Sequence, residues 1–164
     1  ALQLAQAYAA LADGGRLHAP RFVRGQAIEE PRALLDPEVA HELLLMLEGV
    51  TGPGGSAVKA AVPRYRVAGK TGTARRAVAG GYEGRYVSVF AGAVPVSRPR
   101  LAAVVVVNDP RGGAYYGGLV AAPVFGRVMD DAMRLLNVAP DHLQPQLIAA
   151  DVPTPAQFAE GVAP

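Results

Sequence analysis

Lys70-Thr71-Gly72-Thr73 is the stretch on which the interpretation of this sequence depends, because it places an ammonium group, two hydroxyls and a glycine in consecutive residues. The flanking residues favour a strand over about 65–74. Side chains alternate between the two faces of a strand, so Thr71 and Thr73 are predicted to share one face and to bind one carboxylate together. Gly72 leaves room for a ligand backbone to lie close to the strand.

The lysine in this stretch is informative, because 14 of the 16 basic residues are arginines and only Lys59 and Lys70 are lysines. This choice favours a compact, mobile charge at position 70. Gly69-Lys70-Thr71 also ends the P-loop pattern for phosphate binding, but that pattern requires a glycine where Arg64 stands and a helix directly afterwards. The glycines that follow disfavour a helix, so a nucleotide site is excluded.

Composition limits the classes of protein that this chain can represent. The 164 residues are 51% hydrophobic, enough for one domain with its own core. A net charge of +2 gives little attraction for nucleic acid, and the absence of cysteine excludes disulfides and thiolate chemistry. No apolar run approaches the roughly 20 residues that span a bilayer. Because the chain starts without methionine, inside a helical pattern, we expect it to be a fragment of a longer protein.

Three helices are expected from apolar residues at helical spacing. The first covers 2–12, with Leu4, Tyr8 and Leu11 on its buried stripe, and ends before Gly14-Gly15. The second begins at Asp36-Pro37, an N-cap followed by proline. Its inward residues are predicted to be Val39, Leu43, Met46, Leu47 and Val50. The third begins at Pro123, and its inward residues are predicted to be Val124, Val128, Ala132 and Leu135.

Three strands are expected over 65–74, 86–91 and 101–107, with a mostly irregular segment before the second helix. A glycine-rich loop is predicted between the first two strands, and the run Val104–Val107 favours a strand covered on both faces. Short connections favour antiparallel neighbours. The predicted fold class is therefore α+β, an antiparallel sheet flanked by helices. Residues 1–138 form the predicted body, and the proline-rich segment 139–164 is expected to be a mobile tail.

Three collinear segments, 2–12, 68–75 and 115–125, resemble the corresponding segments of class B penicillin-binding proteins, and the division-specific penicillin-binding protein 3 group most closely. Lys-Thr-Gly is the third element of the signature shared by penicillin-binding proteins and class A β-lactamases. The resemblance covers roughly residues 1–143. It implies the C-terminal portion of a penicillin-binding-protein/serine β-lactamase-like transpeptidase fold.

The resemblance also implies an activity and a setting. The activity is a peptidoglycan D,D-transpeptidase that forms stem-peptide cross-links through a serine acyl-enzyme during septal cell-wall synthesis. Its partners are the D-Ala-D-Ala stem peptide, β-lactam antibiotics, the upstream half of the same domain and divisome membrane proteins, without nucleic acid or cofactor. The domain is expected in the periplasm, on a protein anchored in the bacterial inner membrane. The alternatives are a β-lactamase-like hydrolase and a non-catalytic penicillin sensor or scaffold.

Site residues follow from the same resemblance. Lys70 and Thr73 are expected to be catalytic, with the Thr73 backbone N–H as one donor of the oxyanion hole. Arg75 is expected at the rim of the substrate site, and Arg76 on plain surface. Adjacent aromatic residues in a glycine-flanked loop are predicted to line a cleft. The expected substrate-binding residues are Thr71, Gly72, Thr73, Arg75, Tyr115, Tyr116 and Gly117.

The nucleophile is expected outside this chain. Ser56 and Lys59 formally match Ser-x-x-Lys, but too few residues separate them from Pro63 for a helix that would fix such a pair. No serine here begins a Ser-x-Asn sequence. The fragment alone is therefore predicted to be inactive. His41-Glu42 starts a zinc-binding pattern whose second histidine is replaced by Leu45, so no metal site is expected.

Overall fold

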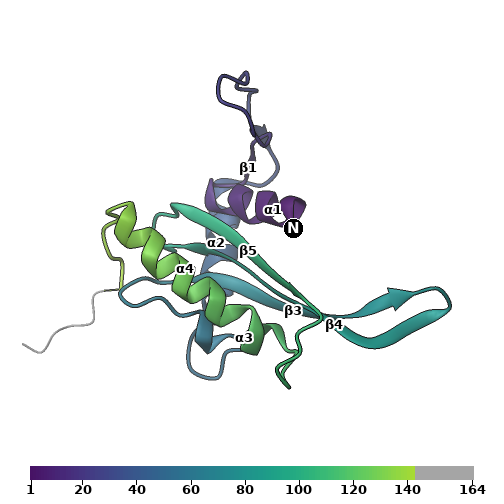
Figure 1. Cartoon of the computed structure of the whole chain (residues 1–164). Helices are drawn as coiled ribbons and strands as arrows, with labels where there is room; N and C mark the ends of the chain where they lie inside the picture. Colours follow the sequence, from purple (N-terminus) through teal and green to yellow (C-terminus); the bar gives the residue numbers. More distant parts are fainter. Residues whose placement is uncertain (143–164) are drawn as a thin grey trace, which may run out of the picture.

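The computed structural model describes residues 1–142, in which helices precede and follow one antiparallel sheet (Figure 1). The elements, in chain order, are α1 (Leu2–Ala12), β1 (Arg16–Leu17), β2 (Arg32–Ala33), α2 (Pro37–Glu48), the 3-10 helix η1 (Val58–Ala60), β3 (Ala68–Val78), β4 (Gly81–Val94), β5 (Leu101–Asn108), α3 (Gly117–Val120) and α4 (Ala122–Leu135).

Strands β3, β4 and β5 form the sheet in that order, and both pairs are antiparallel. Ala68 lies opposite Ala93 in the first pair, and Val94 lies opposite Leu101 in the second. Sequential strands with short connections are thus neighbours, as antiparallel pairing allows. The predicted meander and the α+β class, an antiparallel sheet flanked by helices, are confirmed.

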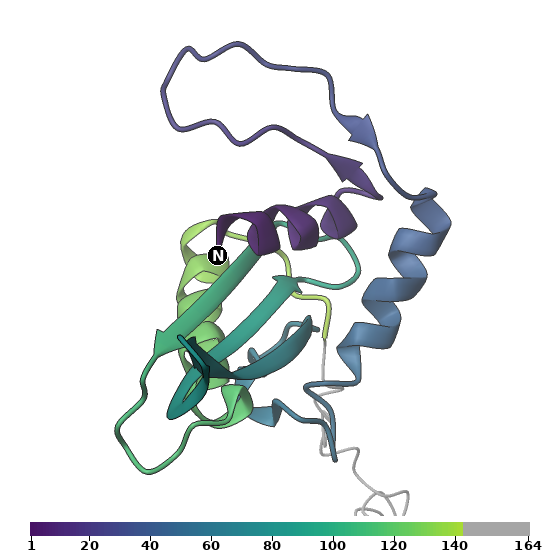
Figure 2. The ribbon, with the colours of Figure 1, turned by 90° about the vertical axis from the view of Figure 1, so that its right-hand side faces the viewer.

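The sheet lies between α4 on one face and α1 with α2 on the other (Figures 1 and 2). The alternation of side chains along β4 produces both interfaces. Phe90 and Val94 pack in the cluster that includes α4, whereas Ala93 packs with Leu44 of α2 and Leu11 of α1. Figure 2 also shows the chain between β1 and β2 projecting from this body.

Helix α4 faces the sheet with larger side chains than the sequence predicted. Phe125, Met129 and Met133 are buried, whereas Val128 is 54% and Leu135 86% exposed. The predicted stripe, which included Val128 and Leu135, is therefore wrong. Residues at spacings of four form the observed stripe, and turning its bulky side chains inward buries more apolar area.

Helix α2 begins as predicted, because the Asp36 carboxylate accepts the Glu38 N–H at 2.9 Å and Pro37 lies in the first turn. Its buried residues are Ala40 and Leu44. The predicted inward residues Val39 and Met46 are instead 45% and 73% exposed. The prediction is wrong for these two residues, whereas Leu47 and Val50 of the same set pack against the core clusters as expected. Helix α2 contacts β3 and α1 through a narrower stripe than its apolar pattern suggests.

Helix α1 ends at Ala12, before Gly14-Gly15, as predicted. Tyr8 of the predicted stripe is buried, whereas Leu4 is 40% exposed. The segment that follows is mostly irregular, as expected, apart from the two-residue pairing of β1 with β2.

The connection between β3 and β4 differs from the predicted glycine-rich loop. The two strands continue beyond the sheet as a ribbon that turns only at Ala79-Gly80 (Figure 1). Gly80 has φ 90°, and a positive φ at the second central residue of a turn favours glycine. A tight turn leaves the flanking residues free to pair, so the predicted loop is wrong.

Strand β5 is an edge of the described sheet, and Val106 is 38% exposed. Helices α1 and α4 both contact β5, so the prediction that Val104–Val107 is covered on both faces is wrong only at Val106. Leu101, Ala103 and Val105 pack on the cluster that includes α4, while the alternate residues lie on the other face.

The predicted division into a body of 1–138 and a tail of 139–164 stays a prediction, since 143–164 lie outside the described residues. Residues 141 and 142 still contact the body. The Asp141 carboxylate accepts the backbone N–H groups of Arg66 and Ser97 at 2.8 and 3.0 Å. The His142 N–H donates to the carbonyl of Arg64 at 2.9 Å.

Candidate active site

The stretch from Lys70 to Thr73 lies in the first half of β3, where it pairs with β4. Thr71 lies opposite Phe90, and Thr73 lies opposite Ser88. Since Phe90 packs in the core beneath α4, both threonines lie on the α4 side of the sheet, and Lys70 with Gly72 lies on the other side. The prediction that the two threonines share one face is confirmed. In the described sheet, β3 has β4 as its single neighbour.

Each of the two threonine hydroxyls has a partner in the chain. Thr71 Oγ1 lies 3.2 Å from Ser56 Oγ, and either can donate. Thr73 Oγ1 accepts the backbone N–H of Gly117 at 3.0 Å. The Lys70 side chain is exposed and donates from Nζ to the Thr71 carbonyl at 3.3 Å. A hydroxyl can both accept and donate, so Thr73 keeps its own proton for a ligand.

The first turn of α3 lies against the backbone of β3 and β4, which explains the glycines there. A Cβ at Gly117 would lie 2.3 Å from the Val89 carbonyl oxygen and 2.6 Å from that of Gly72. A Cβ at Gly118 would meet the Ser56 carbonyl oxygen at 2.0 Å. Only glycine permits this approach, and the approach brings the Gly117 N–H to Thr73.

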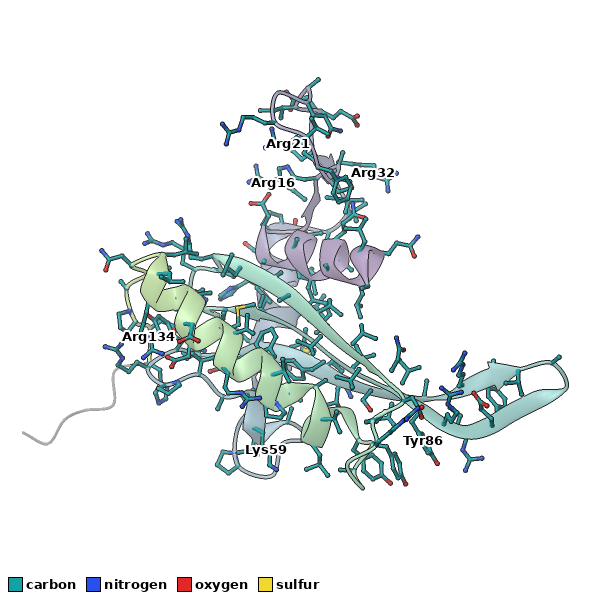
Figure 3. All side chains as sticks on the ribbon, in the orientation of Figure 1. Arg16, Arg21, Arg32, Lys59, Tyr86 and Arg134 are labelled. Atoms are coloured by element: carbon teal, nitrogen blue, oxygen red, sulfur yellow. The ribbon has the colours of Figure 1, made fainter. Side chains whose placement is uncertain are left out.

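An aromatic cluster lies where the ribbon leaves the sheet, a position marked by Tyr86 (Figure 3). Tyr86 and Tyr115 stack with ring centroids 4.0 Å apart, and Tyr116 lies 4.6 Å from Tyr115. Tyr115 donates a hydrogen bond to the Tyr116 hydroxyl, and this contact raises the pKa of the Tyr115 phenol. The Ser88 hydroxyl, which is buried, donates to the Tyr115 carbonyl and fixes this loop against β4.

The structure brings most of the predicted site residues together. Thr73, Gly117 and Tyr115 are connected through β4, and Arg75 lies opposite Tyr86 in the strand register. Arg75 and Tyr116 are exposed. Sequence reasoning missed Tyr86 and Ser88, although the alternation of β4 places both on the same face as Phe90.

Ser56 and Lys59 are not arranged as a helical pair. Ser56 lies before η1, which is three residues long and contains Lys59. The Ser56 hydroxyl instead contacts Thr71. This geometry lacks the helical turn that would place a lysine amine beside a serine hydroxyl.

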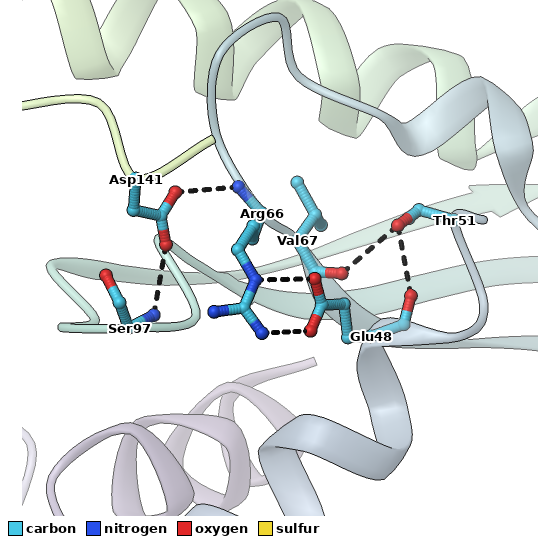
Figure 4. A network of polar contacts seen from close by, with 6 residues as sticks. All are labelled: Glu48, Thr51, Arg66, Val67, Ser97 and Asp141. Carbon is cyan, nitrogen blue, oxygen red and sulfur yellow. Dashed lines mark hydrogen bonds and ion pairs between the residues drawn. The ribbon is translucent and has the colours of Figure 1, made fainter. Parts of the chain in front are cut away.

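A polar network fixes the approach to β3 (Figure 4). Arg66 binds the Glu48 carboxylate with two nitrogens, at 2.7 and 2.5 Å, and this contact raises the pKa of the guanidinium. The Thr51 hydroxyl lies 3.1 Å from the Glu48 carbonyl and 3.2 Å from the Val67 carbonyl. The end of α2 is thereby held to the residues just before the stretch Lys70–Thr73.

Residues 1–142 were searched for a metal-binding group and for a membrane-spanning helix. No group of three His, Cys, Asp or Glu side chains in that range is placed to hold a metal ion. Among the helices of the same range, none has the length and apolar character needed to cross a membrane.

The penicillin binding protein transpeptidase domain is the protein family that matches residues 1–130. The chain belongs to this family, and the fold is that of part of such a domain. The family and fold predicted from the sequence are therefore confirmed.

Individual relatives agree with this assignment. Peptidoglycan D,D-transpeptidase FtsI of Escherichia coli K12 is 43% identical over 144 residues, which cover 87% of this chain and 24% of that protein. Probable peptidoglycan D,D-transpeptidase PbpC of Pseudomonas aeruginosa PAO1 is 39% identical over 150 residues, 91% of this chain and 26% of that protein. The chain thus spans about a quarter of the length of these relatives.

A solved structure gives the same result. The apo structure of the TP domain from Burkholderia pseudomallei penicillin-binding protein 3 is similar with a TM-score of 0.75 at 39% sequence identity. The similarity covers 85% of this chain and 43% of that chain.

Proposed function

We propose that this chain is the C-terminal part of a serine D,D-transpeptidase domain that cross-links stem peptides of septal peptidoglycan and is acylated by β-lactams. The observation that carries the proposal is the pair of threonine hydroxyls on β3. The Gly117 N–H donates a hydrogen bond to the second of them, that of Thr73. This pair lies in a chain of the penicillin-binding transpeptidase family.

The threonines are proposed to bind the terminal carboxylate of the donor peptide, or the equivalent carboxylate of a β-lactam. The Gly117 N–H already occupies the Thr73 oxygen as an acceptor, so the Thr73 O–H is left to donate outward. Lys70 adds positive charge from the other face of the strand. A hydrogen bond from a neutral hydroxyl to a carboxylate is stronger than one between two neutral groups.

The edge of β3 is proposed to receive the substrate as an extended peptide. Edge strands bind such peptides through main-chain hydrogen bonds, and Gly72 leaves the strand without a side chain at the centre of the site. In this arrangement the Thr73 N–H is one donor of the oxyanion hole. In other enzymes, loss of one such donor lowers kcat about 10²–10³-fold. Tyr115 and Tyr116 form one wall of the cleft and Arg75 lies at its rim.

The nucleophile is proposed to be a serine upstream of this chain. Its hydroxyl attacks the carbonyl carbon of the penultimate D-Ala, the bond to the terminal D-Ala breaks, and that residue leaves with the proton. The amine of a second stem peptide then attacks the acyl-enzyme and restores the serine. Two observations support a nucleophile other than Ser56: its hydroxyl contacts Thr71, and no helix pairs it with Lys59. The short length relative to the transpeptidase relatives supports an upstream half that completes the site.

The parent protein is proposed to be anchored in the inner membrane, with this domain in the periplasm and with divisome membrane proteins as partners. Similarity to a protein named FtsI and to a penicillin-binding protein 3 domain supports this setting.

The test is Lys70→Ala in the full-length protein, with Lys59→Ala as the matched control, because these are the two lysines of the chain. Acylation by a fluorescent penicillin is expected to slow about 100-fold or more in the first variant, because the positive charge near the bound carboxylate is lost. The control is expected to match wild type. Unchanged acylation of Lys70→Ala would contradict the role of this residue.

The same assay separates the alternative functions. Slow release of the antibiotic together with peptide cross-linking supports the transpeptidase. Rapid release would favour a β-lactamase-like hydrolase, and binding without cross-linking would favour a sensor or scaffold.

A further inference from the structure

A second pocket lies at the base of the β3–β4 ribbon, apart from the two threonines. It has a volume of about 510 Å³ and is lined by residues of the ribbon, of the end of β5 and of the segment that follows β5. Three guanidinium groups surround it. The lining residues are Arg76, Arg85, Tyr86, Val87, Asn108, Asp109 and Arg111.

Five charged side chains alternate in sign around this pocket. Glu83 Oε1 lies 3.4 Å from Arg76 Nε and 3.7 Å from Arg85 Nη1. Asp109 Oδ2 lies 3.0 Å from Arg85 Nη2 and 3.4 Å from Arg111 Nη2. Three positive groups thus meet two negative ones, and the series carries an excess of one positive charge. The hydrogen bond from Arg85 also lowers the pKa of Asp109, which favours the ionised form of this carboxylate.

The two end members of this series keep most of their hydrogen-bonding capacity. A guanidinium has five N–H donors, and the ion pairs described use one nitrogen each of Arg76 and Arg111. Their side chains are 53% and 87% exposed, so a ligand has access to them. The planar arrangement of these donors matches carboxylate oxygens. The pocket is therefore suited to a carboxylate that approaches from solvent.

The pocket and the aromatic cluster of the proposed active site have Tyr86 in common. The Asp109 N–H donates to the Tyr86 carbonyl at 2.8 Å, while the Tyr86 ring stacks on Tyr115. Val87 also lines the pocket and lies opposite Ala74 of β3. Alternation places Val87 on the same face as Lys70, opposite the face of Thr71 and Thr73. One carboxylate group cannot occupy both places.

We infer that this arginine pocket binds a carboxylate of a second peptide, the acceptor stem peptide whose amine resolves the acyl-enzyme. The inference rests on the proposed transpeptidase function, since it assigns the other substrate of the same reaction. Arg76 and Arg111 contact the acceptor, while Glu83 and Asp109 hold the guanidinium groups in place. The donor carboxylate remains with the threonines of β3.

The experiment uses the full-length protein and the double variant Arg76→Gln/Arg111→Gln, with Arg127→Gln as the control. Arg127 is exposed on α4, away from the pocket. The acceptor is a synthetic stem peptide with free carboxylates, compared with the same peptide carrying carboxamides. The double variant is expected to raise KM for the carboxylate acceptor roughly tenfold, as for the loss of two exposed ionic contacts. The Arg127→Gln control is expected to keep the wild-type KM.

Two further readouts make the result specific. KM for the carboxamide acceptor is expected to be the same in wild type and in the double variant. The rate of acylation by a fluorescent penicillin, which needs no acceptor, reports that the donor site is intact. An unchanged KM for the carboxylate acceptor, or an equal rise for both acceptors, would overturn the inference.

Failure of the proposed function gives a different pattern. Wild-type protein that is not acylated by penicillin contradicts the transpeptidase assignment, and the inference falls with it. Wild-type protein that is acylated and cross-links peptides, but whose double variant behaves as wild type, contradicts the arginine pocket alone.

Discussion

The two faces of the β3–β4–β5 sheet are packed very differently. On the α4 face, the large side chains of Phe90, Phe125, Met129 and Met133 are almost entirely buried. On the opposite face, the buried cluster contains mainly smaller residues, with Leu44 of α2 as its largest member. The same helix α2 leaves Met46 73% exposed.

This difference separates the two halves of the proposed site. Thr71 and Thr73 lie on the face with the bulky core, where α3 and Ser88 fix the surrounding loops. Lys70 and the arginine pocket lie on the more open face, where side chains are exposed. Groups that must be held in one geometry thus rest on the rigid face, and groups that act through charge lie where solvent and substrates have access.

The largest expected effect comes from the core of the α4 face. Phe125→Ala removes a fully buried ring that packs edge to face on Phe90, with the two ring centroids 4.8 Å apart. The free energy of unfolding is expected to fall by about 3–5 kcal/mol. Urea denaturation of the transpeptidase domain measures this loss. Val128→Ala on the same helix, where the side chain is 54% exposed, is expected to cost no more than about 0.5 kcal/mol. Equal losses would show that the two positions are not distinguished by packing.

The contact of α3 with the sheet is expected to matter next. Gly117→Ala places a Cβ 2.3 Å from the Val89 carbonyl oxygen, so the first turn of α3 must move away from Thr73. Such overpacking costs about 1–3 kcal/mol. If half of that cost falls on the site, acylation by penicillin is expected to slow about two- to tenfold. Stopped-flow acylation measures the rate. Gly112→Ala is the control, because a Cβ there meets nothing within 4 Å, and a similar decrease in both variants would refute the argument.

A smaller effect is expected on the α2 side. Glu48→Gln removes the charge that pairs with Arg66, in a contact whose side chains are about 30% exposed. The domain is expected to lose about 1–2 kcal/mol, measured by thermal unfolding. Glu42→Gln, on the exposed surface of the same helix, is expected to have no measurable effect. A Glu48→Gln variant as stable as wild type would show that the network in Figure 4 contributes nothing to stability.

The smallest expected effect belongs to Ser56. Ser56→Ala removes the hydroxyl beside Thr71, and acylation of the full-length protein is expected to stay within about twofold of wild type, as for loss of one exposed neutral hydrogen bond. The chain 1–164 alone is expected to remain unlabelled by a fluorescent β-lactam. Stoichiometric labelling at Ser56 would contradict both the inactive fragment and the upstream nucleophile.

Local patterns predicted much of this architecture. The strand signal around Lys70–Thr73 predicted the shared face of the two threonines, because alternation is a property of any extended strand. Asp36-Pro37 predicted the start of α2, and the short turns predicted the antiparallel meander. The segments 68–75 and 115–125 identified the family that the comparison then established.

Other features depended on packing between segments far apart in the chain. Which stripe of α4 turns inward was decided by the space beneath Phe90, since several apolar stripes fit the helical period. The contact of Gly117 with Gly72 and the stacking of Tyr86 on Tyr115 join residues about 30 or more positions apart. The sequence by itself determined the local elements and the chemical groups they carry. Only the tertiary structure decided which groups meet, because burial and register depend on distant partners.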